Sequence, residues 1–219
     1  MITFEDVKNN IEIKTCIEHG NDLLGNLGFT EHSFVHAGRV AQTASYLLTE
    51  LGYNKREIEL ARIAGYIHDI GNMINRYDHA QSGGVLAYNI LMRMGMDCDE
   101  VATICAAVGN HDEGTGNAIS AVSAALILAD KADVRRSRVR RLNVAEYDIH
   151  DRVNYAVERS DLLVDKINGR IILDMDIDTE ISSVMDYFEI FLGRMLMCRK
   201  AANFFDMKFR IVANGTKIL

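Results

Sequence analysis

The sequence predicts a mainly α-helical domain followed by a small α+β unit. Apolar residues recur at steps of three and four over most of the first part of the chain, which is the spacing of amphipathic helices. The 219 residues include no proline, and this agrees with a helical chain because proline interrupts helices. After residue 150 the pattern changes to strand-like segments separated by Asn-Gly pairs. We therefore expect a helical domain at residues 1–150 and an α+β unit at residues 151–219.

Six helices are expected in the first domain, each bounded by a glycine or by a capping residue. Asn54 is expected to cap the third helix, with Glu57 three residues later as in a capping box. This helix should continue through His68 and Asp69 and stop at Gly71. The other five are expected at residues 11–24, 34–51, 79–94, 99–109 and 120–134.

The second unit is expected to contain a β-hairpin, a helix and further strand. Strands are predicted at 160–166 and 170–176, a helix at 180–203, and strands at 205–212 and 216–219. Asn168-Gly169 predicts a type I′ turn, which requires positive φ at both central residues, and Asn214-Gly215 joins the last two strands. A sheet of three or more strands with a helix packed on it can be stable.

Composition restricts the class of protein. A hydrophobic share of 48% supports a full core, and no apolar run approaches the ~20 residues that a membrane span needs. Nothing at the start resembles a signal peptide, and the four cysteines show no paired spacing, so we expect reduced thiols in a cytoplasmic protein. The net charge of −7 argues against nucleic acid as a partner.

Histidines and aspartates form one ordered series along the first domain. Imidazole and carboxylate together suit first-row transition metals. Six ligands exceed what one catalytic ion with open positions requires, but they suffice for two ions that share a carboxylate. The series is His36, His68, Asp69, His79, His111 and Asp130.

The spacing of the series suggests how two ions would be held. His68 and Asp69 lie about 100° apart on a helix, so one residue can bind one ion while the Asp69 carboxylate bridges to the second. His36 and Asp130 would complete the first site, and His79 and His111 would hold the second. Two ions about 3.5–4 Å apart can activate water and stabilise the attacking and leaving oxygens of phosphoryl transfer. We expect divalent iron or manganese, with magnesium, nickel and zinc as alternatives.

The series resembles the H…HD…D signature of the HD phosphohydrolase superfamily. Residues 66–71, Tyr-Ile-His-Asp-Ile-Gly, reproduce its HDIG form, and the resemblance covers roughly residues 30–140. It implies an HD-domain helical bundle, a metal-dependent phosphohydrolase activity and the same six ligand positions. Asp69 and His68 would then be catalytic residues as well as metal ligands.

Within that superfamily, the outline is most similar to the branch that splits dinucleoside tetraphosphates symmetrically. Asn72 stands where members that cleave cyclic di-GMP usually carry lysine, and residues 111–117 lack their Gly-Tyr-Pro signature. Gly71-Asn72 also differs from the acidic pair of the guanosine-tetraphosphate hydrolases. The resemblance implies a small phosphorylated substrate, a nucleotide.

Basic residues follow Asp130 directly, beginning with Lys131. Arginine pairs bidentately with phosphate oxygens, so Arg135 and Lys131 are candidates for contacting the substrate phosphate. The alternative for the whole run is a solvated helix face. Its arginines are Arg135, Arg136, Arg138, Arg140 and Arg141. His32, one turn before His36, is expected to be solvent-exposed, with contact to substrate as the alternative, and Asp112 is a candidate for ordering water or binding metal.

The sequence therefore predicts a di-metal phosphohydrolase, with two alternatives. One is a non-catalytic sensor or scaffold that binds partners through the C-terminal unit, and the other uses the same metals for O₂ chemistry. A homodimer could form through the sheet edges, because unpaired strand edges bind other strands.

Overall fold

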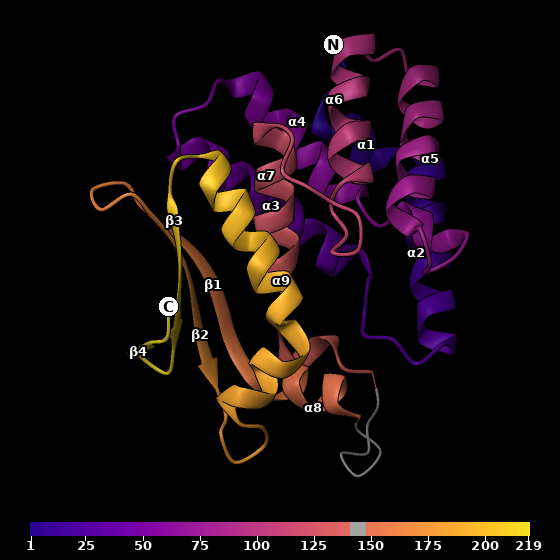
Figure 1. The fold of residues 1–219 in the computed structure, drawn as a ribbon. Helices are drawn as coiled ribbons and strands as arrows, with labels where there is room; N and C mark the ends of the chain where they lie inside the picture. The colour runs from indigo at the N-terminus through magenta and orange to yellow at the C-terminus, as the bar shows by residue number, and fades with distance from the viewer. Residues whose placement is uncertain (141–147) are drawn as a thin grey trace.

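The computed structural model describes residues 1–140 and 148–219 and confirms a mainly α-helical fold with a small sheet (Figure 1). The N-terminal helices are α1 Phe4–Asn9, α2 Ile11–Asn26, α3 Phe34–Glu50, α4 Lys55–Ile67, α5 His79–Arg93, α6 Cys98–Gly109 and α7 Ala121–Ala132. Two 3₁₀ turns are η1 Ile70–Met73 and η2 Arg136–Arg138. The C-terminal part contains α8 Ile149–Ala156, β1 Val157–Asp165, β2 Arg170–Ile177, α9 Val184–Phe204, β3 Lys208–Ala213 and β4 Thr216–Lys217.

Helices α3 and α4 pack closely, and this pairing carries two of the predicted ligands. A Cβ atom on Gly65 would lie only 2.8 Å from the Ala41 Cα, so the two backbones can approach this closely only because residue 65 is glycine. The predicted cap of α4 is confirmed, since the Asn54 side chain accepts from the backbone N–H groups of Arg56 and Glu57. The close packing brings the end of α4 next to the first turns of α3.

The end of α4 differs from the prediction. The α-helix stops at Ile67, and Asp69 adopts φ −97° and ψ 6° before the 3₁₀ turn η1 begins. The prediction that this helix continues through Asp69 and stops at Gly71 was therefore wrong. The physical reason is close contact with α5, because a Cβ atom on Gly71 would lie 2.0 Å from the carbonyl oxygen of His79. The tight turn lets α5 begin directly beside the His68-Asp69 pair.

The C-terminal strands form a four-stranded sheet in the order β1-β2-β3-β4. The β1–β2 and β3–β4 pairs are antiparallel, whereas β2 and β3 are parallel. Parallel neighbours need a crossover connection, and α9 supplies it. This helix packs against β2 and β3 and also contacts α7 of the helical part (Figure 1). The predicted hairpin, helix and strand are thus present, and α9 connects this sheet to α7 of the helical part.

The two Asn-Gly pairs form different turns. Asn214 and Gly215 have φ values of 50° and 73°, so both central residues are in the left-handed region, as a type I′ turn requires. At the first pair only Gly169 has positive φ, at 62°, and the type I′ prediction was wrong there. The loop is longer than two residues because Asp165 pairs with Arg170, and the Asp165 carboxylate accepts from the Asn168 backbone N–H. A longer loop of this kind is usually built on a type I turn.

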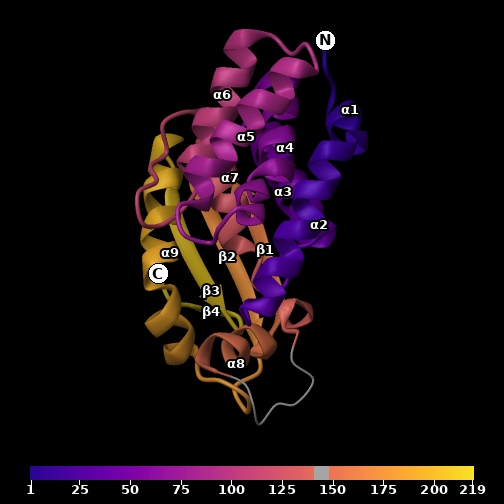
Figure 2. The same ribbon diagram turned by 90° about the vertical axis from the view of Figure 1, so that its right-hand side faces the viewer.

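One hydrophobic cluster runs through the described residues, from Phe4 in α1 to Ala213 in β3. Figure 2 shows α1 and α2 on one side of the molecule and α9 on the other, with α7 between them. No helix among residues 1–140 and 148–219 has the length and apolar character to cross a bilayer. The division at residue 150 stays a prediction.

Candidate metal centre

The six predicted ligands come from five places in the fold and meet in its interior. His36 lies on α3, His68 and Asp69 follow from α4, and His79 begins α5. His111 follows α6, and Asp130 lies in the last turn of α7. The four imidazoles are at most 3% exposed. Clusters of imidazole and carboxylate groups that could hold a metal ion therefore lie in the interior of the fold.

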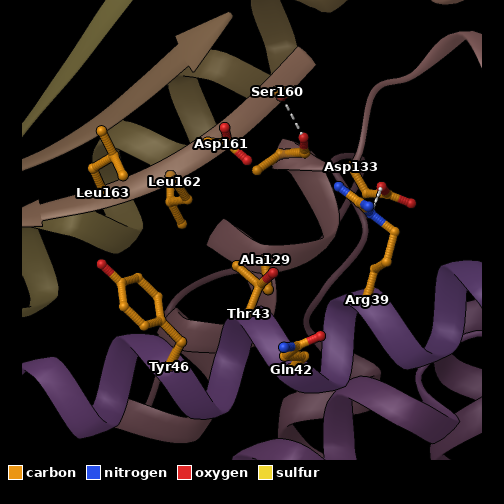
Figure 3. A pocket seen from close by; sticks show the side chains of 11 residues that line it. Arg39, Gln42, Thr43, Tyr46, Ala129, Asp133, Ser160, Asp161, Leu162 and Leu163 are labelled. Carbon is orange, nitrogen blue, oxygen red and sulfur yellow. Dashed lines mark hydrogen bonds and ion pairs between the residues drawn. The ribbon is translucent and has the colours of Figure 1, made fainter. Parts of the chain in front are cut away.

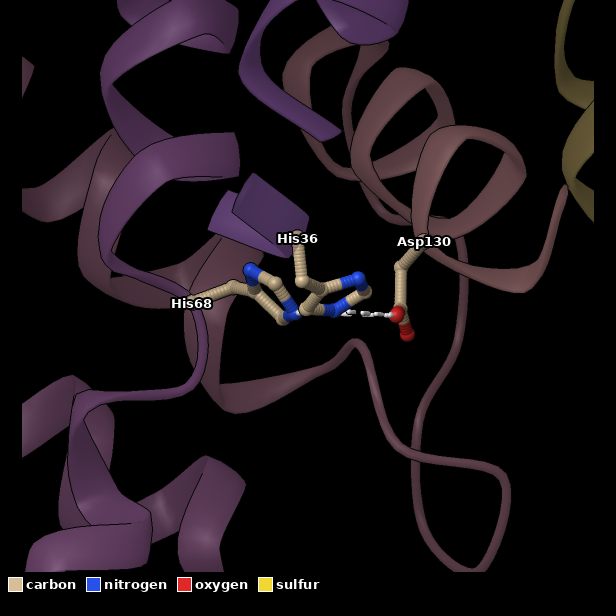
Figure 4. Close-up of side chains that lie close together, drawn as sticks. All are labelled: His36, His68 and Asp130. Atoms are coloured by element: carbon tan, nitrogen blue, oxygen red, sulfur yellow. Dashed lines mark hydrogen bonds and ion pairs between the residues drawn. The ribbon is translucent and has the colours of Figure 1, made fainter. Parts of the chain in front are cut away.

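One half of the centre contains His36, His68 and Asp130, whose side chains point toward one another in Figure 4. The Nε2 atoms of His36 and His68 lie 3.3 Å apart. The Asp130 Oδ1 atom lies 3.4 Å from the His36 Nε2 atom and 3.5 Å from that of His68. Two imidazole nitrogens and one carboxylate oxygen therefore surround a single point.

The Asp69 carboxylate divides its two oxygens between the halves of the centre. Its Oδ2 atom lies 3.2 Å from the His68 Nε2 atom and 3.6 Å from that of His36. Its Oδ1 atom faces the other way, 3.4 Å from His79 Nε2 and 3.7 Å from His111 Nε2. The Nε2 atoms of His79 and His111 are 3.1 Å apart. The donor set fits two ions with one bridging carboxylate, the arrangement that two-metal hydrolytic sites use.

Each imidazole is oriented through its other nitrogen, as metal-binding histidines usually are. In every case the Nδ1–H group donates to an oxygen, which leaves the Nε2 lone pair directed at the centre. The acceptors are Asp133 Oδ2 for His36 at 2.7 Å, the Gly65 carbonyl for His68 at 2.8 Å, the Arg76 carbonyl for His79 at 3.0 Å and the Val108 carbonyl for His111 at 2.6 Å.

Asp133 connects the centre to a separate cavity of about 270 Å³ (Figure 3). Its Oδ1 atom accepts from Arg39 at 2.9 Å, while its other oxygen accepts from His36. Burial raises the pKa of the Asp133 carboxyl, but the His36 hydrogen bond and nearby arginines outweigh burial and lower it. None of the six predicted ligands lines this cavity. Asp133 therefore acts on the centre through the orientation of His36.

Opposite charges lie close together at the centre and shift one another's pKa values. Burial lowers the pKa of His68, but the Asp69 and Asp130 carboxylates outweigh burial and raise it to about 10. Burial would raise the pKa values of both carboxyls, yet His68 beside Asp69 and Lys131 beside Asp130 hold them well below their usual range. Burial lowers the pKa of His79 to about 4. Without metal, the centre is thus a buried ion-pair cluster.

The two basic residues predicted to contact phosphate have different surroundings. Lys131 lines the space around Asp69 and Asp130, with its Nζ atom 2.7 Å from Asp130 Oδ2. Arg135 does not line that space, because its guanidinium pairs with Asp133 and Glu31 at 3.0 and 2.9 Å. Their catalytic roles stay predictions.

Of the rest of the arginine run, Arg138 lines the space around Asp69. The alternative prediction of a solvated helix face was wrong for residues 135–140, which form an extended segment and the short η2 turn. Arg141 lies outside the described residues.

Three residues lie near the centre although the sequence did not predict them there. The His32 side chain is only 12% exposed, with its Nε2 atom 3.9 Å from Asp69 Oδ2, so the prediction of solvent exposure was wrong. Arg76 and Arg194 also line the space around Asp69. No motif marks them, and Arg194 belongs to the C-terminal unit. Asp112 lies at the edge, 4.0 Å from His79 Nε2.

The chain is similar to known proteins in its sequence. The model of the HD domain family matches residues 33–153, just over half of the chain. An uncharacterized protein of Methanocaldococcus jannaschii is 24% identical over 183 residues, covering 73% of this chain and 70% of that protein. A crystal structure of a predicted HD superfamily hydrolase from an uncultured Thermotogales bacterium is 26% identical. It covers 57% of this chain and 67% of its own, with a TM-score of 0.44.

Proposed function

Because this chain belongs to the HD domain family, we propose that it is a metal-dependent phosphohydrolase that cleaves a phosphate ester or anhydride bond in a nucleotide. The observation that carries the proposal is the position of Asp69, whose two carboxylate oxygens face two separate sets of imidazole nitrogens. A single catalytic ion would not need both sets. We propose iron or manganese as the ions, since mixed imidazole and carboxylate ligands suit them.

When bound, two such ions supply an activated water and neutralise charge on the phosphoryl group. The chain's own residues hold and orient these parts. The four imidazoles are fixed by their Nδ1–H hydrogen bonds, and the Asn72 side chain donates to Asp69 Oδ1 at 2.9 Å. The Lys131 ammonium lies beside Asp130, where it can also stabilise charge that develops on the leaving group.

Replacing Asp69 with alanine tests the proposal. The variant should lose most bound metal and at least ~100-fold of its hydrolytic rate, because the bridging carboxylate contributes to both halves of the centre. Purified protein loaded with Mn²⁺ or Fe²⁺ would be incubated with nucleoside monophosphates, dinucleoside polyphosphates and cyclic dinucleotides. Chromatography identifies the products, and elemental analysis counts the ions.

Asp22→Ala is the matched control, since Asp22 is an exposed carboxylate on α2. It should retain both metal and activity. Full activity in folded Asp69→Ala would contradict the proposal. Metal binding by the wild-type protein without any product would instead support the sensor or scaffold alternative.

A further inference from the structure

A cavity of about 380 Å³ opens directly beside the metal centre. It shares four side chains with the space around Asp69 and Asp130, namely His32, Arg76, Arg138 and Arg194. These four therefore lie between the metal centre and the larger cavity. Three of them are arginines in a protein whose net charge is −7, which is the charge pattern of an anion-binding site.

Arg76 has no carboxylate partner among residues 1–140 and 148–219. Its Nη1 atom instead lies 3.1 Å from His79 Nε2 and 3.5 Å from the Asn72 side-chain oxygen. The guanidinium carbon is 5.8 Å from the centre of the Phe29 ring, within the distance of a weak cation–π contact. An arginine beside a metal centre without a compensating carboxylate is available to an anionic ligand.

Arg194 reaches the same place from α9. Its Nε atom is 2.8 Å from Glu113 Oε1, and its guanidinium carbon is 4.4 Å from the centre of the Phe191 ring. Glu113 follows the ligand His111 by two residues and also lies 3.4 Å from the Lys131 Nζ atom. Among residues 1–140 and 148–219, the guanidinium therefore pairs with a carboxylate through its Nε side alone. The Phe191 ring packs against the planar guanidinium group and restricts its orientation, a geometry that suits bidentate binding of phosphate.

Arg138 completes the group and is almost fully buried. Its Nε–H and Nη1–H groups donate to the backbone carbonyls of Glu31 and Asp133, at 2.9 and 2.8 Å. The Asp133 carboxylate lies farther away, at 3.9 Å. Carbonyl oxygens carry no net charge, so these two hydrogen bonds do not neutralise Arg138, and the Asp133, Asp130 and Glu31 carboxylates offset part of its positive charge.

We propose that Arg194, with Arg76 and Arg138, binds a second phosphoryl group of the substrate, next to the one that is cleaved. This inference rests on the proposed hydrolytic function of the adjacent centre. With two ions bound, the centre and Lys131 would already balance the charge of the phosphoryl group that is cleaved. The unpaired charge of Arg76 and the partly compensated charges of Arg138 and Arg194 would then match an additional anionic group. The preferred substrate then carries a phosphate chain, as a nucleoside diphosphate does, and a lone phosphomonoester is bound less well.

The cavity beyond the arginines suits the rest of such a substrate. Its volume is near the lower end of the range of about 300–1000 Å³ for small-molecule pockets, so it suits one nucleoside-sized group. Phe29, which is 41% exposed, offers an aromatic face, and His150 and Asn154 from α8 add polar groups. The carboxylates of Asp148 and Asp151 also line this cavity, so the positive charge lies at its end next to the metal centre, where the arginines are. Both α8 and α9 belong to the C-terminal part, which the proposal makes part of the substrate-binding site.

Arg194→Gln and Arg199→Gln form a matched pair for the test. Both changes remove one positive charge from α9, but Arg199 is exposed on that helix and lines neither cavity. Titration calorimetry would measure binding of AMP and of α,β-methylene-ADP, whose bridging carbon prevents cleavage between its phosphates, to Mn²⁺-loaded protein. Steady-state kinetics with AMP, ADP and ATP would give kcat/KM for the wild-type protein and both variants.

In Arg194→Gln, the loss of affinity for α,β-methylene-ADP should exceed the loss for AMP by about tenfold or more. The kcat/KM values for ADP and ATP should fall by a similar excess over that for AMP, and Arg199→Gln should show no such difference. Equal losses for mono- and diphosphate, or the same loss in Arg199→Gln, would overturn the proposal. If Arg194→Gln does not fold, Arg194→Lys carries the same test, because it keeps the charge but lacks the planar fork.

The two readouts separate this inference from the proposed function. A selective loss of diphosphate binding in Arg194→Gln, without hydrolysis by the wild-type protein, would support the anion site and contradict the proposed hydrolase activity. Hydrolysis by the wild-type protein, with equal losses for mono- and diphosphate in Arg194→Gln, would support the hydrolase activity and contradict the anion site.

Discussion

His68 lies between two carboxylates, and its protonation determines how metal binding depends on pH. In the metal-free protein the pKa of His68 is raised from 6.5 to about 10, so the imidazolium and the Asp69 and Asp130 carboxylates stabilise the fold. Because the folded-state pKa is the higher one, this stabilisation is fully present below about pH 6.5 and is lost as pH rises through about 10. A metal ion needs the neutral imidazole and must displace that proton.

We therefore expect affinity for Mn²⁺ to rise with pH between about 7 and 10, and binding to release about one proton from His68. Over the same interval the unfolding temperature of the metal-free protein should fall. Calorimetric titrations at pH 7.5 in two buffers of different ionisation enthalpy measure the released protons. His68→Asn should release fewer protons, and a wild-type protein that releases none would contradict this prediction.

The sequence order predicted which residues meet at the centre, because an ordered series of histidines and aspartates is typical of metal binding. It did not predict the arginines. Arg76 and Arg194 stand in no motif, and their relation to Asp69 depends on how α5 and α9 pack rather than on spacing along the chain. For Arg135, the neighbouring Glu31 and Asp133 compete for its guanidinium, and Glu31 is more than 100 residues distant in sequence.

At the scale of secondary structure, the turn between α4 and α5 positions three of the six predicted ligands. Gly71→Ala should destabilise the protein by roughly 2–4 kcal/mol and weaken metal binding, because the added Cβ atom would overlap the His79 carbonyl oxygen and the Gly83 backbone nitrogen. Urea unfolding gives the free energy of unfolding, and elemental analysis gives the metal content.

Gly38→Ala is the matched control for this substitution. Gly38 lies inside α3, two residues after His36, and a Cβ atom there would meet nothing within 4 Å. Alanine should stabilise the helix by about 0.5–1 kcal/mol and leave metal content unchanged. Equal effects of the two substitutions would show that the turn does not depend on close contact at Gly71.

Long helices with regular apolar spacing were predicted to within a few residues, as α3 and α5 illustrate. Elements that depend on tertiary contacts were not. The end of α4 is set by contact with α5, and neither α1 nor α8 was expected because each has eight residues or fewer and too few turns to show a period. The β strands were located by their Asn-Gly turns, but the parallel pairing of β2 with β3 follows from the position of α9.

For the whole molecule, the shared hydrophobic core predicts one unfolding transition. Buried residues of α7, α9 and the sheet belong to a single cluster, so the helical part and the C-terminal part should lose structure together. Differential scanning calorimetry should show one transition, with equal calorimetric and van't Hoff enthalpies, that moves upward when Mn²⁺ is added. Two separate transitions would instead support independent domains divided near residue 150.

The crossover position of α9 also has a consequence for the order in which the protein is made. All six predicted metal ligands precede residue 131, whereas Arg194 follows Asp130 by roughly 60 residues. At about 5–20 residues per second, the ribosome would complete the predicted ligand set several seconds before the last arginine of the proposed anion site. A nascent chain would therefore contain all six predicted metal ligands before it contains Arg194, the residue that we propose helps to select the substrate.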